Sequence, residues 1–182
     1  MLIVDSQIHM WGANTPERPW PNRGAPHRPV PITQDSLLRD MAAAGVDRTV
    51  IVPPMWEGDR NDLALAAARM HPDRFAIMGR IDPDAPASHG KLATWRAQPG
   101  MLGLRFSFSQ PLLQPLLTEG RVDWVWGEAE KAGVRIYVLV KSENLPLIDT
   151  VAVRHPGLKL VIDHLALPSG KKDEEAFRNL DR

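Results

Sequence analysis

The sequence contains no cysteine, and this absence removes two kinds of chemistry. A chain of 182 residues without cysteine forms no disulfide bond and offers no thiolate as a nucleophile or metal ligand. It also lacks any apolar run close to the roughly 20 residues that span a bilayer. Its first residues do not have the charged and apolar segments of a signal peptide. These absences predict a soluble, cytoplasmic protein with no membrane partner.

Neither sign of charge dominates the sequence. Lysine and arginine together number 22, against 22 aspartate and glutamate residues, and they form no basic stripe. A nucleic-acid partner is therefore not expected. A glycine-rich phosphate turn of the form G-x-G-x-x-G is missing as well. The expected partner is a small-molecule substrate, and a homo-oligomer is left open.

What the sequence does contain is a repeated strand-then-helix unit. Apolar runs that are typical of strands begin near Leu2, Thr49, Phe75, Leu102, Arg135 and Leu158. The segments with helical patterns between and after them are residues 35–44, 64–70, 122–133, 145–154 and 173–180. This alternation favours parallel βαβ units, either in an open doubly wound sheet or in a closed barrel. The missing phosphate turn argues against the doubly wound sheet. We predict an α/β fold of the (β/α)8 TIM-barrel type.

The length of the chain limits how much of a barrel it holds. A complete barrel takes about 250 residues, so we predict about six of the eight βα units and a C-terminally truncated chain. We expect residues 1–182 to form a single domain. Its long loop at residues 12–31 is rich in proline. A loop of this length is often a lid over a binding site, and a solvated surface excursion is the alternative.

Active sites of such barrels lie at the carboxyl ends of the strands, and polar residues gather there. In the first strand, alternation places Asp5, Gln7 and His9 on one face. Burying this row is costly without partners, a ligand or a metal. The alternative is an edge strand whose polar face meets water. The other candidates at strand ends are Trp11, Arg80, Arg105, Ser107, Asp163 and His164.

Two histidines and one arginine have both a functional and a structural interpretation. His9 and His164 each end an apolar strand, where an imidazole can bind a metal, orient a substrate oxygen or move a proton. Each could instead be a core histidine bonded to a backbone carbonyl. Arg105 would be a costly buried cation without an anion. It is either a clamp for a carboxylate or lactone carbonyl, or a structural partner of Asp82 or Asp163.

Four motifs occur in order along the chain. They are Val-Asp-Ser-Gln-Ile-His-Met-Trp at 4–11, Gly-Arg-Ile-Asp-Pro at 79–83, Gly-Leu-Arg-Phe at 103–106 and Val-Ile-Asp-His-Leu at 161–165. Together they resemble the amidohydrolase-related proteins (the amidohydrolase 2 group), which include lactonases and metal-dependent decarboxylases. The resemblance implies a (β/α)8 barrel. It places His164 at the histidine position of the sixth strand and Arg105 among the substrate-binding candidates.

The first strand departs from the pattern of that family, which usually has His-x-His there. Gln7 stands in place of the first histidine, while His9 stands at the second position. An amide is a poorer transition-metal ligand than an imidazole, so the departure favours a metal-independent, lactonase-like branch with no cofactor. The alternative is a divalent metal, zinc or manganese, bound by His9 and His164. In the family the base that activates water is an aspartate on an eighth strand, beyond the six strands counted here.

The resemblance implies a hydrolase that opens a lactone or similar cyclic ester of a small anionic metabolite. His9 and His164 are the expected catalytic residues. The expected substrate contacts are Gln7, Trp11, Arg80, Arg105 and Ser107. The alternatives are a divalent-metal-dependent decarboxylase or amidohydrolase, and an inactive fragment. Whether the 182-residue chain is active by itself is left open.

Overall fold

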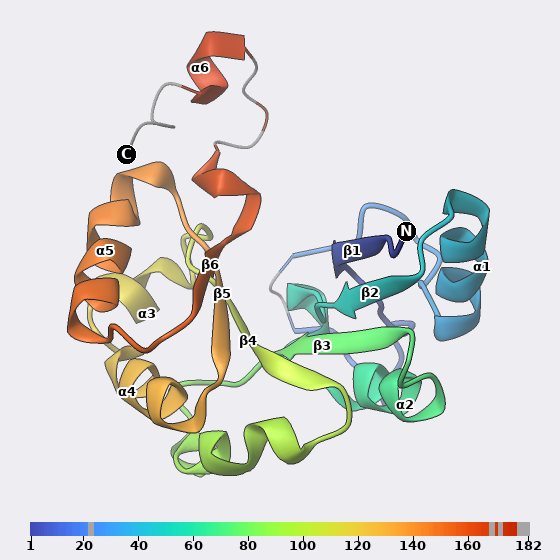
Figure 1. Ribbon diagram of the computed structural model, residues 1–182, viewed down its shortest axis with the longest axis horizontal. Coiled ribbons are helices and arrows are strands. Elements are labelled where there is room, and N and C mark those ends of the chain that lie inside the picture. Colours follow the sequence, from blue (N-terminus) through green and yellow to red (C-terminus); the bar gives the residue numbers. More distant parts are fainter. Residues whose placement is uncertain (22–23, 168–169, 171–172, 178–182) are drawn as a thin grey trace. The chain divides into compact units, whose positions relative to one another are not determined.

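The fold is an alternation of strands and helices along the chain (Figure 1). The computed structural model describes residues 1–21, 24–167, 170 and 173–177. Each strand begins within two residues of its predicted start. The predicted part of the last helix at residues 178–180 lies outside the described residues.

The boundaries of the elements are as follows. The strands are β1 (Val4–Ile8), β2 (Arg48–Ile51), β3 (Phe75–Gly79), β4 (Met101–Ser107), β5 (Arg135–Leu139) and β6 (Leu160–Ile162). The α-helices are α1 (Gln34–Ala44), α2 (Asp62–Met70), α3 (Gln114–Thr118), α4 (Asp123–Ala132), α5 (Leu145–Arg154) and α6 (Asp173–Phe177). The 3-10 segments are η1 (Met55–Glu57), η2 (Pro86–Ser88), η3 (Lys91–Ala97), η4 (Ser142–Asn144) and η5 (Asp163–Ala166).

Helix α1 begins and ends at the residues that its sequence indicates. The Thr33 side chain accepts a hydrogen bond from the backbone N–H of Ser36, and the Ser36 hydroxyl bonds back to the N–H of Thr33. This reciprocal pair satisfies two donors that the first helical turn leaves unpaired. At the other end, Gly45 has φ of 69°, the left-handed conformation that glycine adopts without a Cβ clash. Threonine before the helix and glycine after it are residue types that these two cap positions favour.

The strands form a parallel sheet in the chain order β1-β2-β3-β4-β5-β6. The α/β class with parallel strands is thus as predicted. Strands β1 and β6 stand at the two ends of this order, so in the described part of the chain each has only one strand neighbour. Side chains at the start of β1 are accordingly exposed, Val4 to 49%.

The register of β1 contains an irregularity that affects its predicted polar row. Asp5 pairs with Thr49 and Ile8 with Ile51, so three steps along β1 match two along β2. A bulge of this kind interrupts the two-residue alternation of faces. Asp5 is exposed, and its carboxylate accepts the backbone N–H of Gln7 at 3.0 Å. The prediction of one continuous row of Asp5, Gln7 and His9 is therefore wrong.

The chain divides into two compact units, each with its own apolar core. Unit one comprises Met1–Asp82 and Thr94–Gly103, and unit two comprises Pro83–Ala93 and Leu104–Arg182. In unit one, strands β2 and β3 bury the side chains of Ile51 and Ile77 completely. Every helix in the described residues is too short or too polar to cross a membrane.

The core of unit two is aromatic on one side of β4. Phe106 and Phe108 stack with ring centroids 5.5 Å apart, and both rings meet Trp126 of α4 edge to face. Ile136 and Val138 of β5 are fully buried. Since residues of β4 alternate between faces, the burial of Phe106 and Phe108 directs Arg105 and Ser107 to the opposite face.

Candidate functional site

His9 follows β1 and is held by the end of β2. Its Nδ1 lies 2.7 Å from the carbonyl oxygen of Val52, and the same valine donates its backbone N–H to the Ile8 carbonyl at 2.8 Å. A carbonyl oxygen only accepts, so Nδ1 carries the proton and donates it. In the neutral ring, Nε2 therefore holds the lone pair. The backbone thus fixes both the orientation and the tautomer of His9.

Trp11 lies in an aromatic cluster beside His9. Its ring meets that of Trp56 edge to face at 5.4 Å, and Trp56 in turn meets the His9 ring at 6.0 Å. His27 packs against Trp11 at 5.6 Å, and the Arg28 guanidinium lies 5.9 Å from the centre of the indole. Trp11 is fully buried. Its predicted substrate contact stays a prediction.

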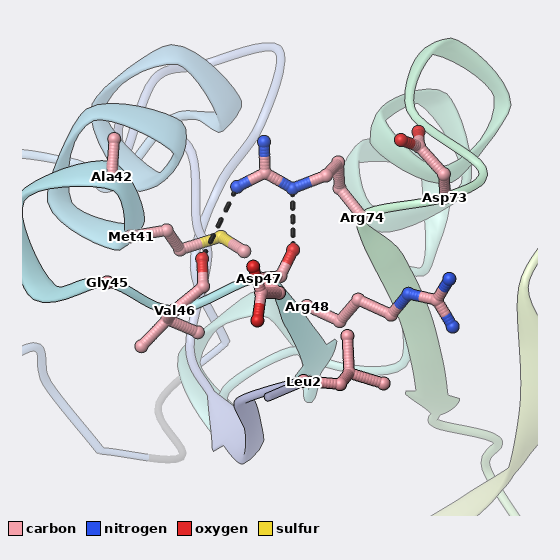
Figure 2. A pocket seen from close by; sticks show the side chains of 9 residues that line it. All are labelled: Leu2, Met41, Ala42, Gly45, Val46, Asp47, Arg48, Asp73 and Arg74. Atoms are coloured by element: carbon pink, nitrogen blue, oxygen red, sulfur yellow. Dashed lines mark hydrogen bonds between the residues drawn. The ribbon is translucent and has the colours of Figure 1, made fainter.

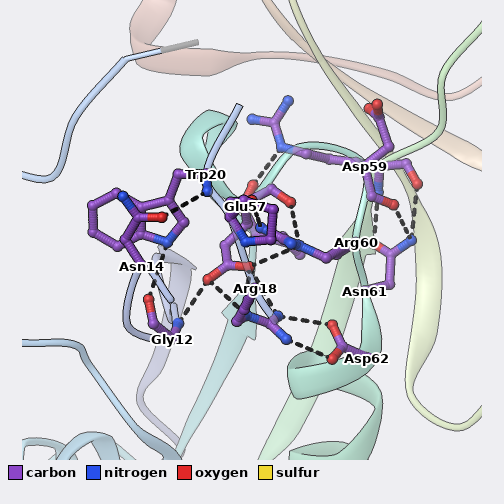
Figure 3. Close-up of polar contacts among 12 residues, drawn as sticks. Gly12, Asn14, Arg18, Trp20, Glu57, Asp59, Arg60, Asn61 and Asp62 are labelled. Carbon is purple, nitrogen blue, oxygen red and sulfur yellow. Dashed lines mark hydrogen bonds and ion pairs between the residues drawn. The ribbon is translucent and has the colours of Figure 1, made fainter. Parts of the chain in front are cut away.

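The loop at residues 12–31 is fastened by a buried carboxylate (Figure 3). Glu57 of η1 accepts the backbone N–H of Gly12 at 2.7 Å and is ion-paired with Arg18 at 2.8 Å. Arg18 also donates two parallel hydrogen bonds to Asp62, at 2.8 and 2.9 Å. These contacts raise the pKa of the Arg18 guanidinium, and the bond to Arg18 lowers the pKa of Asp62. Nearby, Trp20 donates its indole N–H to the Gly12 carbonyl.

Arg80 follows β3 in a backbone conformation that Asn61 fixes. The Asn61 amide accepts the backbone N–H of Arg80 and donates to its carbonyl, both at 2.8 Å. A Cβ on Gly79 would lie only 2.8 Å from the Asn61 side-chain oxygen, so this approach requires glycine. The Arg80 side chain is buried and donates through Nε to the carbonyl of Pro53.

Arg105 is buried in unit two and paired with Asp163. Its Nε donates to Asp163 Oδ2 at 2.9 Å, and its Nη1 donates to the hydroxyl of Ser107 at 2.6 Å. Burial lowers the pKa of the Arg105 guanidinium, and the negative charge of Asp163 opposes this fall. The predicted structural partner, Asp163, is thus confirmed. The structure brings Arg105 and Ser107 together, as expected for neighbours on one face of β4.

Tyr137 of β5 lies close enough to Asp163 to respond to its charge. Burial raises the pKa of the Tyr137 phenol, and the negative charge of Asp163 raises it further. In the register of the sheet, Tyr137 pairs with Val161, two residues before Asp163 in the chain. Sequence reasoning missed this residue, although it is the only tyrosine of the chain.

His164 lies in an unusual left-handed turn after β6. Its φ is 53°, and the φ angles of Leu165 and Ala166 are both 54°. Left-handed backbone costs about 1 to 2 kcal/mol for each residue that is not glycine. The His164 side chain is exposed, so the structural alternative of a buried core histidine is wrong for this residue.

The described residues do not fit a metal ion. Among them, no group of three or more His, Asp or Glu side chains lies close enough together to hold one. His9 offers one imidazole nitrogen, and Gln7 offers an amide in place of a second imidazole. An amide and a single imidazole are a weak ligand set for zinc or manganese, so we derive no step that passes through a metal.

A hollow of about 440 Å³ lies elsewhere in unit one, beside the start of β2 (Figure 2). Arg74 crosses it, donating through Nε to the Asp47 carbonyl at 2.6 Å. It is lined by Leu2, Met41, Ala42, Gly45, Val46, Asp47, Arg48, Asp73 and Arg74. These residues surround the amino end of the strand, whereas barrel active sites use the carboxyl ends. The hollow includes none of the predicted site residues.

The predicted site residues are thus distributed over both units. Gln7, His9, Trp11 and Arg80 belong to unit one, whereas Arg105, Ser107 and His164 belong to unit two. We expect Gln7 and His9 to converge with Arg105 and His164 at one end of the sheet, and this stays a prediction. Glu57 was also missed, because a single glutamate between Trp56 and Gly58 gives no sign that it is buried. The available signal for a buried, ion-paired carboxylate was the presence of arginines on both sides of Glu57 in the sequence, namely Arg18 and Arg60.

Comparison with known proteins shows which family this sequence matches. The sequence model of the amidohydrolase family matches residues 4–180. The L-fucono-1,5-lactonase of Burkholderia ambifaria is 28% identical over 185 residues, covering 91% of this chain and 57% of that protein.

Two solved structures show the same fold. A probable 2-pyrone-4,6-dicarboxylic acid hydrolase from Acinetobacter baumannii, with citric acid bound, aligns with a TM-score of 0.77 and 18% identity over 99% of this chain and 65% of that one. An amidohydrolase from Burkholderia multivorans with bound zinc aligns with a TM-score of 0.75 and 22% identity, over 99% of this chain and 63% of that one. The chain spans about three fifths of the length of these relatives. On the match over residues 4–180, the chain belongs to the amidohydrolase family.

Proposed function

We propose that the chain binds and polarises a lactone, or a similar cyclic ester of a small anionic metabolite, in a hydrolase that opens the ring. Support comes from the family and from the names of two relatives, an L-fucono-1,5-lactonase and a probable 2-pyrone-4,6-dicarboxylic acid hydrolase. The complete eight-stranded barrel and a possible homo-oligomer belong to this proposal. A cytoplasmic location stays a prediction.

The orientation of His9 is the observation that carries the proposal. Because Nδ1 donates to the Val52 carbonyl, Nε2 holds the lone pair of the neutral ring and carries the second N–H of the charged ring. A protonated Nε2 donates a hydrogen bond to the oxyanion that develops when water attacks the lactone carbonyl. Gln7 would donate its amide N–H to the same oxygen or to the ring oxygen. A glutamine in this role needs no metal.

The other predicted residues keep defined roles in the proposal. In unit one, the buried Arg80 and Trp11 would shape the surroundings of His9. In unit two, the exposed His164 would orient a ring or move a proton, with Ser107 buried in the same unit. The eighth-strand aspartate that the resemblance implies has no counterpart in the six strands described here. We therefore assign the water-activating base to none of the described residues.

The proposal is tested by lactone binding to the 182-residue chain. L-Fucono-1,5-lactone and 2-pyrone-4,6-dicarboxylate are the probes, and isothermal titration calorimetry measures the Kd of each. His9→Ala should abolish binding of at least one probe that the parent binds. The matched control is His89→Ala, because the exposed His89 packs on Trp124 in unit two. No binding by the parent, or equal loss in both variants, would contradict the proposal.

A metal-dependent reaction is the second candidate. The observation that favours it is the zinc in the amidohydrolase of B. multivorans. Metal analysis of protein purified without chelator separates the two candidates. About one equivalent of zinc or manganese per chain, lost together with probe binding after chelation, would favour the second. Probe binding that survives chelation favours the first.

A further inference from the structure

The turn that carries His164 needs support from outside itself. His164 and Leu165 are exposed, whereas Asp163 before them and Ala166 after them are buried. The three consecutive left-handed residues include no glycine, so local sequence does not favour this conformation. A strained turn of this kind persists only where surrounding contacts determine it.

Asp163 provides that contact through Arg105. Its Oδ2 accepts the Nε proton at 2.9 Å, and the two side chains are only 2% and 4% exposed. Arg105 lies 58 residues earlier in the chain, on β4, and is itself oriented by the Ser107 hydroxyl at 2.6 Å. The start of the turn is thus tied to a strand of the core of unit two.

We infer that Arg105 is a positioning residue for His164: it holds the Asp163 carboxylate, which fixes the left-handed turn and the direction of the imidazole. This inference rests on the proposed function in one respect, the contact of His164 with the lactone. It departs from the interpretation of Arg105 as a substrate clamp. Two of the three guanidinium nitrogens, Nε and Nη1, already donate to side chains of the protein.

A clamp and a positioning residue differ in how they respond to substrate charge. A clamp that pairs with a carboxylate matters only for an anionic ligand. A residue that positions His164 matters equally for a neutral lactone. L-Fucono-1,5-lactone is neutral and 2-pyrone-4,6-dicarboxylate is anionic, so this pair of probes separates a carboxylate clamp from a positioning residue. The conformation of the turn without ligand separates a clamp on the lactone carbonyl, because such a clamp leaves the free turn unchanged.

The conformation of the turn is measured first, without any ligand. Arg105→Met removes the guanidinium donor and Asp163→Asn removes the negative charge of the acceptor, so each breaks the ion pair. NMR follows the backbone 13Cα shifts and HN–Hα couplings of residues 164–166. Both variants should move these signals in the same direction, away from left-handed values. Arg154→Met is the matched control, because Arg154 is exposed at the end of α5. It should leave the signals of the turn unchanged.

Ligand binding is measured next on the same variants. Arg105→Met and Asp163→Asn should weaken both probes by a similar factor, about tenfold. The double variant Arg105→Met/Asp163→Leu should be no weaker than either single one, because all three lose the same ion pair. This double variant also leaves no unpaired buried charge, so it keeps the test available if a single variant does not fold.

Three results would overturn the inference. The first is a turn that keeps its left-handed signals in the folded single and double variants. The second is weaker binding of the dicarboxylate with unchanged binding of the neutral lactone, which identifies a clamp. The third is a double variant that loses much more than either single variant. If the parent binds neither probe, the proposed function fails while the NMR signals still decide whether Arg105 holds the turn.

Discussion

The buried carboxylate of Glu57 should be among the most sensitive positions in unit one. It lies under the beginning of the loop at residues 12–31 and is 2% exposed. It accepts hydrogen bonds from the Gly12 N–H at 2.7 Å and the Arg18 Nε–H at 3.0 Å, and it is ion-paired with Arg18 Nη2 at 2.8 Å and with Arg60 Nε at 3.3 Å. Glu57→Ala removes all of these bonds at once and leaves the Arg18 cation with one carboxylate partner, Asp62.

The magnitude follows from how far each partner is buried. Removing one member of a buried ion pair costs about 3 to 5 kcal/mol. Arg18 is 20% exposed and keeps Asp62, so we expect the lower end for Glu57→Ala, about 3 kcal/mol. Asp62 is 59% exposed, and its replacement by alanine should cost about 0.5 to 1 kcal/mol. For a chain of this size, 1 kcal/mol corresponds to about 2 to 4 °C in Tm.

Urea unfolding followed by circular dichroism measures these differences. Glu57→Gln keeps an acceptor for Gly12 but loses the charge, so it should fall between the parent and Glu57→Ala. The control is Glu17→Gln, which changes an exposed glutamate of the same loop. A loss for Glu57→Ala no larger than that for Asp62→Ala would refute the argument that burial of this carboxylate fastens the loop.

Three further predictions concern single groups. The one tyrosine of the chain, Tyr137, should ionise above the ordinary phenol pKa of about 10 in an absorbance titration at 295 nm, and Asp163→Asn should bring its pKa closer to that value. The Gly157 N–H lowers the pKa of Glu130, so the stability it adds is present above the unfolded glutamate pKa of about 4.3 and is lost as pH falls through the folded pKa. The unfolding free energies of the parent and Glu130→Gln, measured from pH 7 to 3, should therefore converge in acid. Gln7→His should raise zinc affinity well above that of the parent in equilibrium dialysis, and a parent that already binds zinc tightly would contradict the metal-independent interpretation.

Local signals in the sequence predicted the elements well. The cap at Thr33, the left-handed glycine at Gly45 and the end of α5 before a histidine–proline pair each depend on neighbouring residues. Alternating strands and helices likewise gave the α/β class, because periodicity reflects which face each element buries. These features need no knowledge of distant contacts.

The site was harder to predict because its details depend on contacts between distant residues. The bulge in β1 comes from its register with β2, and nothing within residues 3–9 indicates an extra residue. The left-handed turn at His164 contains no glycine to mark it. The sequence left two roles open for Arg105, and only the fold shows that Asp163 is its partner.

The contacts of the proline-rich loop at residues 12–31 also limit which of its residues could move as a lid. The backbone N–H of Trp11 donates to the Ile32 carbonyl at 3.1 Å, so the two ends of the loop are joined. Its first part is bound to Glu57 through Gly12 and Arg18, and moving that part would break charged hydrogen bonds to a buried carboxylate. Residues 24–31 carry no such bond in the described structure; His27 and Arg28 contact Trp11 only through ring and cation–π contacts. In the described residues, charged hydrogen bonds to a buried carboxylate therefore oppose a lid motion of residues 12–18, and the lid stays a prediction for residues 24–31.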